Sequence, residues 1–149
     1  SVVVNFSSSA VKSVKKLDVS TLTNPQNIGG LMGAYAQSKM AVTAITILMK
    51  EALFEESILI LSADPGPTKS QMTDAGDGIP WFLRLLRPLI FKPASVQAEK
   101  LVKAVDSVVS EKKTGLFITQ GYRKPNPAIA LNQKIQNDLG KLLDTLAVP

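Results

Sequence analysis

The stretch "AYAQSKMAVTAITILMKEALFEESILILSA", residues 34–63, decides the fold. Its first part carries apolar residues at helical spacing, which predicts one long helix from Ala34 to about Glu55. The second part, "SILILSA" from Ser57, is a short apolar run typical of a buried parallel strand, and it breaks at a Pro-Gly turn. A helix that leads directly into a buried strand is the repeating unit of a parallel α/β fold.

The segments on either side continue this alternation of strands and helices. "VVVNF" at residues 2–6 predicts a first strand, and "TGLFITQ" at residues 114–120 predicts another. A helix is expected to start near Pro93 or Ser95 and to run to about Ser110, and a last amphipathic helix covers roughly Pro127 to Leu143. The order of these elements predicts parallel strands joined by right-handed crossovers.

Composition limits the chemistry that is available. The 149 residues, 45% hydrophobic and 19% charged, indicate one globular domain spanning residues 1–149. The chain contains no cysteine, which excludes a thiolate nucleophile and a cysteine-bound metal, and no histidine, which excludes an imidazole base. Acid–base chemistry near neutral pH must therefore use Tyr, Lys, Asp or Glu.

Charge and hydropathy bear on partners and location. The net charge of +5 is scattered along the chain, and only 5% of residues are aromatic, so nucleic-acid binding is not expected. The longest apolar run, residues 40–49, is too short to span a membrane, and no signal-peptide pattern is visible. The lack of cysteine fits a reducing compartment, so we expect a cytoplasmic protein.

Polar side chains gather where the predicted strands end. Ser7, Ser8 and Ser9 follow the first strand, and "DPGPTKS", residues 64–70, follows the second. In parallel α/β sheets the carboxyl ends of the strands line one binding crevice. The long helix begins at the same rim, and Tyr35 and Lys39, four residues apart, share one of its faces.

Three segments, "VVNFSSSA", "YAQSK" and "DPGPTKSQMT" in this order, strongly resemble the second half of a short-chain dehydrogenase/reductase. The resemblance runs over essentially the whole chain. It implies an α/β fold, a partial Rossmann-like doubly wound parallel sheet made of the last three strands plus helices, with the N-terminal half absent. It also implies that residues 2–6, 58–61 and 116–119 form adjacent parallel strands in that order.

The resemblance also implies an activity and a set of site residues. The activity is the transfer of a hydride between NAD or NADP and a carbonyl or secondary alcohol of a small molecule. The implied catalytic residues are Ser8, Tyr35 and Lys39, with Ser7 and Ser9 as rivals to Ser8. The implied cofactor-binding residues are Tyr35, Lys39, Pro65, Gly66, Thr68 and Ser70.

These roles agree with general chemistry. A phenol ordinarily gives up its proton only near pH 10, and a neighbouring ammonium favours the phenolate. Lys39 is therefore expected to make Tyr35 a usable general acid or base, and the family implies that Lys39 also holds the nicotinamide ribose. A serine hydroxyl can hold the substrate oxygen in line with the reacting carbon. None of this needs histidine, cysteine or a metal.

The sequence departs from the family in several places. No glycine-rich phosphate loop follows a strand, and "GGLMG" at residues 29–33 is interpreted as a hinge before the helix. The stretch from Ser8 to Tyr35 is longer than is common in the family, which leaves room for an inserted loop at residues 12–27. Such a loop either shapes a substrate pocket or decorates the surface, and we favour surface decoration. We expect this chain alone to bind neither NAD nor NADP measurably. The unpaired edge of the strand at residues 2–6 is expected to favour aggregation, and a homo-oligomer remains open.

Other interpretations stay open. The segment "WFLRLLRPLIFK", from Trp81, has three interpretations. It could form an apolar lid over a substrate, pack plainly against the sheet, or lie at a membrane surface as the interfacial segment of a membrane-surface protein. Membrane association is the weaker expectation. A further alternative is an inactive remnant or binding module that kept the fold and lost the cofactor.

Overall fold

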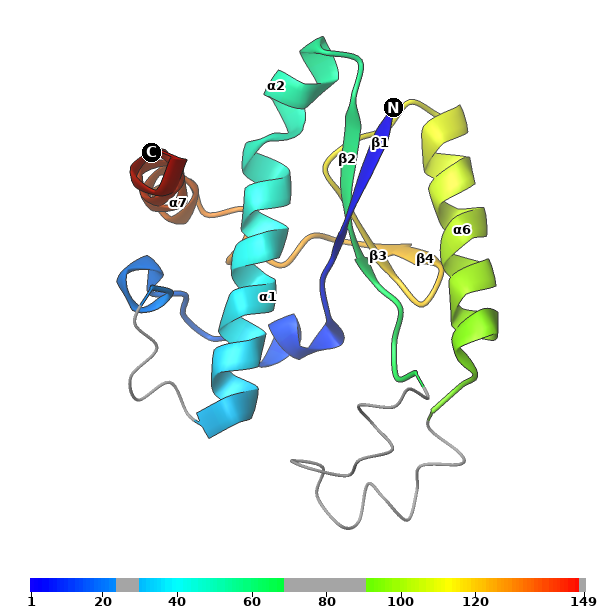
Figure 1. The fold of residues 1–149 in the computed structure, drawn as a ribbon, viewed down its shortest axis with the longest axis horizontal. Coiled ribbons are helices and arrows are strands. Elements are labelled where there is room, and N and C mark those ends of the chain that lie inside the picture. The colour runs from blue at the N-terminus through cyan, green and yellow to red at the C-terminus, as the bar shows by residue number, and fades with distance from the viewer. Residues whose placement is uncertain (24–29, 69–90, 148–149) are drawn as a thin grey trace.

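The computed structural model describes residues 1–23, 30–68 and 91–147. These residues form an α/β structure with an open, mixed, four-stranded sheet and helices on both of its faces (Figure 1). In chain order the elements are β1 (Val2–Phe6), the 3₁₀ helices η1 (Ser9–Ser13) and η2 (Val19–Thr21), α1 (Gly30–Leu48), α2 (Lys50–Glu55), β2 (Leu59–Asp64), α6 (Ala94–Ser110), β3 (Leu116–Thr119), β4 (Tyr122–Lys124) and α7 (Gln133–Ala147).

The sheet order confirms the predicted order of the first three strands. The strands lie in the order β1-β2-β3-β4, and β2 pairs in parallel with both β1 and β3. All six residues of β2 are buried, because helices cover both of its faces, and this accounts for the apolar run with which the strand begins. Among the described residues β1 has β2 as its only neighbour, and Val2, Val3 and Phe6 are exposed.

The prediction of a purely parallel sheet is wrong at the far edge. The short strand β4 pairs antiparallel with β3, and no sequence pattern had indicated it. The two strands are joined through Gln120 and Gly121, whose φ angles are 51° and 85°. Two consecutive positive φ angles are typical of the tight hairpin turn that matches the twist of a sheet. The chain therefore reverses directly after β3 instead of leaving the sheet.

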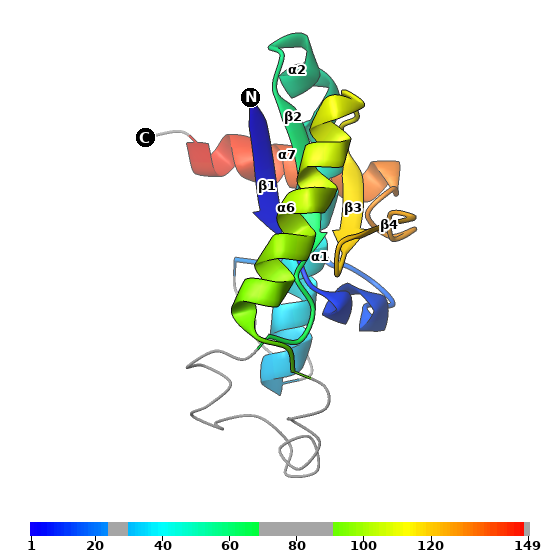
Figure 2. The same cartoon turned by 90° about the vertical axis from the view of Figure 1, so that its right-hand side faces the viewer.

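Two cores lie on the two faces of the sheet. Figure 1 shows α1 and α7 on one side and α6 on the other, and Figure 2 shows α6 lying along the strands. Because side chains alternate along a strand, Phe117 of β3 packs with Met40 and Leu139 on the first side, whereas its neighbour Ile118 packs with Leu101 on the second.

The long predicted helix exists, with different limits. It begins at Gly30, so residues 30–33 of "GGLMG" belong to the helix and the hinge interpretation is wrong. It is also interrupted at Met49, whose ψ of −7° opens the helix for one residue before α2 continues to Glu55. The predicted Tyr35–Lys39 spacing lies inside regular helix, well away from this break.

The segment at residues 12–27 is more than surface decoration. Val14 and Leu17 are buried in the core against α1, together with Val11 of the preceding 3₁₀ turn. Side chains that fill a core constrain the path of their backbone. The part of this segment that the structure describes, residues 12–23, therefore helps to hold α1 in place.

The last helix starts later than predicted. Residues 127–131 form hydrogen-bonded turns, and α7 begins at Gln133 after Asn132, whose side chain accepts a hydrogen bond from the Ile135 amide at 3.2 Å. This is the usual bond of an Asn cap at a helix start. In the described parts of the chain, no helix has both the length and the apolar character that a membrane crossing requires.

Candidate functional site

The predicted catalytic residues lie where β1 ends and the first turns of α1 begin. In Figure 1 β1 runs toward the end of the molecule where α1 starts, so the two elements are antiparallel. The Lys39 Nζ donates a hydrogen bond to the carbonyl oxygen of Phe6, the last residue of β1, at 3.0 Å. A residue of the helix is thereby tied to the strand end that carries the serines.

Tyr35 and Lys39 are neighbours in space as well as in sequence. The Lys39 Nζ lies 5.7 Å from the centre of the Tyr35 ring, within the range of a cation–π interaction. The Tyr35 side chain is 41% exposed, so its hydroxyl is not locked into the core. An ammonium group has three N–H donors, and the bond to Phe6 uses one of them. The other two remain for a ligand or for water.

Ser7 is built into the scaffold. It is only 4% exposed, and its Oγ bonds both the Thr43 Oγ1 at 2.7 Å and the Lys39 carbonyl oxygen at 3.3 Å. Its amide donates to the Ala63 carbonyl of β2 at 2.8 Å. The hydroxyl and the amide of Ser7 hold β1, β2 and α1 together. The choice of Ser8 over Ser7 and Ser9 as the catalytic serine stays a prediction.

Ser8 is half-buried, and its hydroxyl makes fewer hydrogen bonds than that of Ser7. Its Oγ accepts a hydrogen bond from the Ala10 amide at 3.2 Å and so caps η1. The described residues provide no acceptor for the hydrogen of this hydroxyl. Ser8 can therefore still donate, which is the role that a carbonyl oxygen requires. Ser9, the first residue of η1, is also half-buried, and its hydroxyl makes no side-chain bond among the described residues.

A ladder of hydroxyl groups joins α1 to the sheet behind the site. The Thr46 Oγ1 accepts from the Asn5 Nδ2 at 3.0 Å and from the Ser62 Oγ at 2.9 Å, and it donates to the Val42 carbonyl at 2.9 Å. One turn closer to the site, the Thr43 Oγ1 repeats the pattern between Ser7 and the Lys39 carbonyl. Directional bonds of this kind fix the rotation of α1, and hence the face on which Tyr35 and Lys39 lie.

The second rim segment follows β2. Asp64 is 3% exposed, its Oδ1 accepts from the Gly66 amide at 2.9 Å, and its Oδ2 accepts from the Thr119 Oγ1 at 3.0 Å. The Thr68 Oγ1 donates to the Gly66 carbonyl at 2.9 Å. Asp64 therefore fixes the Pro-Gly turn to β3. Its place directly before Pro65 is the signal that could have singled it out.

Gly66 allows a close approach of side chains to this turn. Its φ is +80°, and a Cβ at this position would lie 2.6 Å from the Gln120 Cγ and 3.0 Å from the Gln97 Nε2. Only glycine suits such a backbone. No sequence pattern had indicated Gln97, which α6 contributes. Gln97 is 3% exposed, and its Oε1 has no hydrogen-bond partner among the described residues.

Several predicted residues cannot be placed. Ser70 and residues 81–90 of the segment from Trp81 lie outside the described residues, so the lid and the membrane-surface interpretations stay predictions. Within residues 1–23, 30–68 and 91–147, no group of three or more acidic, histidine or cysteine side chains could hold a metal ion. No protein-family model matches the chain, and a search of curated proteins finds no match.

Proposed function

We propose that the chain is the catalytic part of a nicotinamide-dependent oxidoreductase of the short-chain dehydrogenase/reductase type, built on a partial Rossmann-like sheet. One observation carries the proposal. The Lys39 ammonium lies over the Tyr35 ring and is bonded to the end of β1, two residues before Ser8. A phenol, an ammonium and a serine at one strand end are sufficient for proton transfer to a carbonyl oxygen.

Each residue has a distinct task in this proposal. Tyr35 gives its proton to the substrate oxygen during reduction and removes it during oxidation. Ser8 donates a hydrogen bond to the same oxygen and orients the carbonyl group. Lys39 holds the nicotinamide ribose with the two N–H donors that its bond to the Phe6 carbonyl oxygen leaves.

The segment after β2 is suited to the nicotinamide end of a cofactor. The turn follows the carboxyl end of β2, where ligands of parallel α/β sheets bind, and the bond from the Gly66 amide to Asp64 holds its backbone in place. We assign cofactor contacts to Tyr35, Lys39, Pro65, Gly66 and Thr68, and to Ser70 from the family resemblance. Bound NAD or NADP would supply or accept the hydride.

The pyrophosphate end of the cofactor has no counterpart in this sequence. Phosphates are normally held by a glycine-rich turn that opens a helix, and no such turn follows a strand here. We therefore expect the 149-residue chain alone to give no heat of binding when titrated calorimetrically with NAD or NADP. Tight binding of either cofactor by this chain would contradict that expectation.

The test uses the protein as its gene encodes it. Deuterated NADH and NADPH, labelled at the transferable position, are incubated with a panel of ketones and aldehydes, and the products are analysed by mass spectrometry. Deuterium in a product alcohol is expected with the wild type and is expected to fall at least tenfold with Lys39→Gln. The absence of transfer from both cofactors to every carbonyl would favour the inactive remnant instead.

A further inference from the structure

A cavity lies on the α1 side of the sheet and plays no part in the proposed oxidoreductase chemistry. Its volume is about 440 Å³, within the usual range for small-molecule sites. Val11, Met40 and Phe117 line it, and all three are at most 2% exposed. Val14 and Ile129 extend this apolar lining. The cavity is open to solvent on one side, and the apolar surface that it presents comes mainly from Pro125, Ala128 and Ile129, with Val11, Met40 and Phe117 packed directly beneath.

Two lysines from separate elements line this cavity. Lys12 belongs to η1, directly after Val11. Lys124 is the cross-strand partner of Phe117, and partners directly opposite each other in a sheet share a face, so Lys124 lies on the face that Phe117 presents to the cavity. Both lysines are exposed, and neither forms an ion pair with any residue that the structure describes. No acidic residue lines the cavity.

The wall of the cavity is formed by backbone that is already held in place. Pro125 and Pro127 line it, and the Asn126 Nδ2 between them donates to the Gly115 carbonyl at 2.8 Å. The Ala130 amide donates to the Pro127 carbonyl at 2.9 Å and closes the following turn. A cavity with prolines and bonded turns in its wall loses little conformational freedom when a ligand enters.

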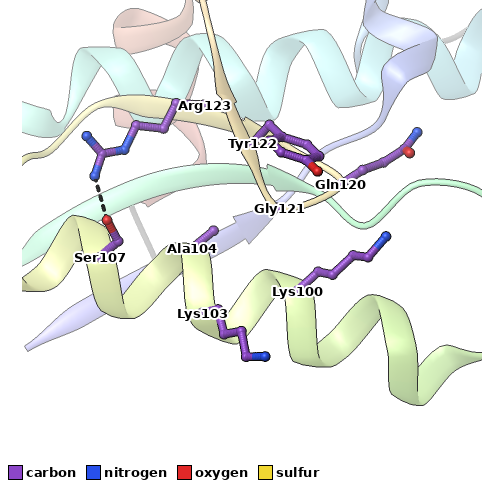
Figure 3. Close-up of a pocket in the computed structure, with 8 residues that line it drawn as sticks. All are labelled: Lys100, Lys103, Ala104, Ser107, Gln120, Gly121, Tyr122 and Arg123. Carbon is purple, nitrogen blue, oxygen red and sulfur yellow. Dashed lines mark hydrogen bonds between the residues drawn. The ribbon is translucent and has the colours of Figure 1, made fainter.

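The cavity between α6 and the β3–β4 hairpin provides a contrast (Figure 3). It is smaller, about 320 Å³, and its lining includes three cations. Two of these already have anionic partners, because Arg123 bonds Glu111 and Lys103 bonds Glu99 at 2.6 Å. Figure 3 shows the Arg123 guanidinium turned toward Ser107. An anionic ligand in this cavity would have to compete with these carboxylates. At Lys12 and Lys124 it would meet no competing carboxylate among the described residues.

We propose that the cavity under Lys12 and Lys124 binds a single-chain apolar carboxylate, with its chain along Pro125, Ala128 and Ile129, directly above Met40, and its carboxylate between the two ammonium groups. Removal of the chain from water drives binding, and the lysines select an anionic head group. The proposal is independent of the proposed oxidoreductase activity.

Met40 provides a direct report of ligand in the cavity. The protein is labelled with ¹³C at its methionine methyl groups and titrated with decanoate below its micelle concentration. The Met40 resonance is expected to shift in a saturable way, whereas that of Met49, which is 40% exposed and does not line the cavity, is expected to stay in place. No shift at Met40, or equal shifts at both residues, would overturn the proposal.

Charge variants test the role of the two lysines. The double variant Lys12→Gln and Lys124→Gln is expected to weaken decanoate binding at least tenfold while leaving the affinity for decanol unchanged. The matched control, Lys15→Gln with Lys141→Gln, removes two exposed lysines outside the cavity and is expected to change neither affinity. Equal weakening by both double variants would show a general charge effect and overturn the site.

A third variant blocks the cavity without touching the core. Ala128 lines the cavity and is exposed, so Ala128→Trp places a large side chain there at little risk to folding. Binding of both decanoate and decanol is expected to be lost, with an unchanged unfolding midpoint. Undiminished decanoate binding to this variant would place the ligand elsewhere and contradict the proposal.

Discussion

The two faces of the sheet are held by different kinds of contact. Behind α6 the core is mainly a cluster of aliphatic side chains, namely Leu61, Ala63, Leu101, Val108 and Ile118, and the one buried polar side chain that α6 adds among the described residues is Gln97, beside Gly66. Behind α1 the aliphatic core is joined by buried hydroxyl groups, with Thr43 and Thr46 both at most 1% exposed and fully hydrogen-bonded. The position of α1, the helix with the predicted catalytic pair, is therefore fixed by directional hydrogen bonds as well as by apolar packing.

This difference suggests a division of labour. Apolar packing stabilises a helix without favouring one rotation strongly, because dispersion forces have little direction. Hydrogen bonds work only over a narrow range of distance and angle. We infer that the α6 face mainly supplies stability, whereas the α1 face supplies both stability and the alignment of Tyr35 with the end of β1.

The largest effect on stability is expected on the aliphatic face. Leu61 is fully buried there, so Leu61→Ala removes apolar contacts and leaves a cavity. The free energy of unfolding, measured with urea, is expected to fall by about 2–5 kcal/mol. Val102→Ala on the exposed side of α6 is the control and should change it by less than about 0.5 kcal/mol. Equal losses in the two variants would contradict the assignment of this core.

A smaller loss is expected on the hydroxyl face. Thr46→Val keeps the shape of the side chain but removes the partner of Asn5 and Ser62, at a cost of about 1–3 kcal/mol in unfolding free energy. Thr46→Ser keeps the hydroxyl and should restore the pairing. Thr145→Val removes an exposed hydroxyl of α7 and serves as the matched control. If Thr46→Val costs no more than Thr145→Val, the buried ladder contributes nothing to stability.

The smallest effect concerns the outer end of α6, where ions rather than apolar groups bind the helix to β4. The Glu111 carboxylate accepts bonds from Arg123 and Lys113, and these lower the pKa of Glu111 well below its usual range. A depressed pKa adds stability above the ordinary pH range of carboxyl titration, and this stability is lost as the pH falls through the lowered value.

Melting temperatures test this sign. Glu111→Gln is expected to lower the melting temperature slightly at pH 7, and the difference from the wild type should shrink as the pH falls below about 4.5. The effect should also shrink in 1 M salt, because the group is exposed and screened. Glu55→Gln, which removes an exposed carboxylate without an ion pair among the described residues, is the control. A difference that grows at low pH would contradict the sign.

The elements that could be predicted from the sequence are those whose burial leaves a clear apolar pattern. "SILILSA" is buried on both sides by helices, so its apolar run alone predicts β2. The strand β4 has three exposed residues and no such pattern, and it forms because Gln120 and Gly121 reverse the chain beside β3. The predicted one-piece helix begins four residues earlier than expected, at Gly30, and is interrupted at Met49, where one backbone angle changes.

The site shows the same limit. The spacing of Tyr35 and Lys39 placed them on one helical face, since helix geometry is local. Spacing could not separate Ser7 from Ser8, because their roles depend on Thr43 and on the turn of η1, which are tertiary partners. Gln97 was missed for the same reason, since α6 brings it to Gly66 only in the folded chain, whereas Asp64 could have been singled out by its place directly before Pro65.

The measurement that tests the central claim most directly compares the only two tyrosines of the chain, in the protein as its gene encodes it. Tyr35→Phe and Tyr122→Phe each remove one hydroxyl from an exposed side chain, so both should leave the unfolding free energy nearly unchanged. The rate of carbonyl reduction at saturating substrate is expected to fall roughly 10²–10⁴-fold for Tyr35→Phe and to stay unchanged for Tyr122→Phe. An undiminished rate for Tyr35→Phe would contradict the assignment of Tyr35 as the proton donor.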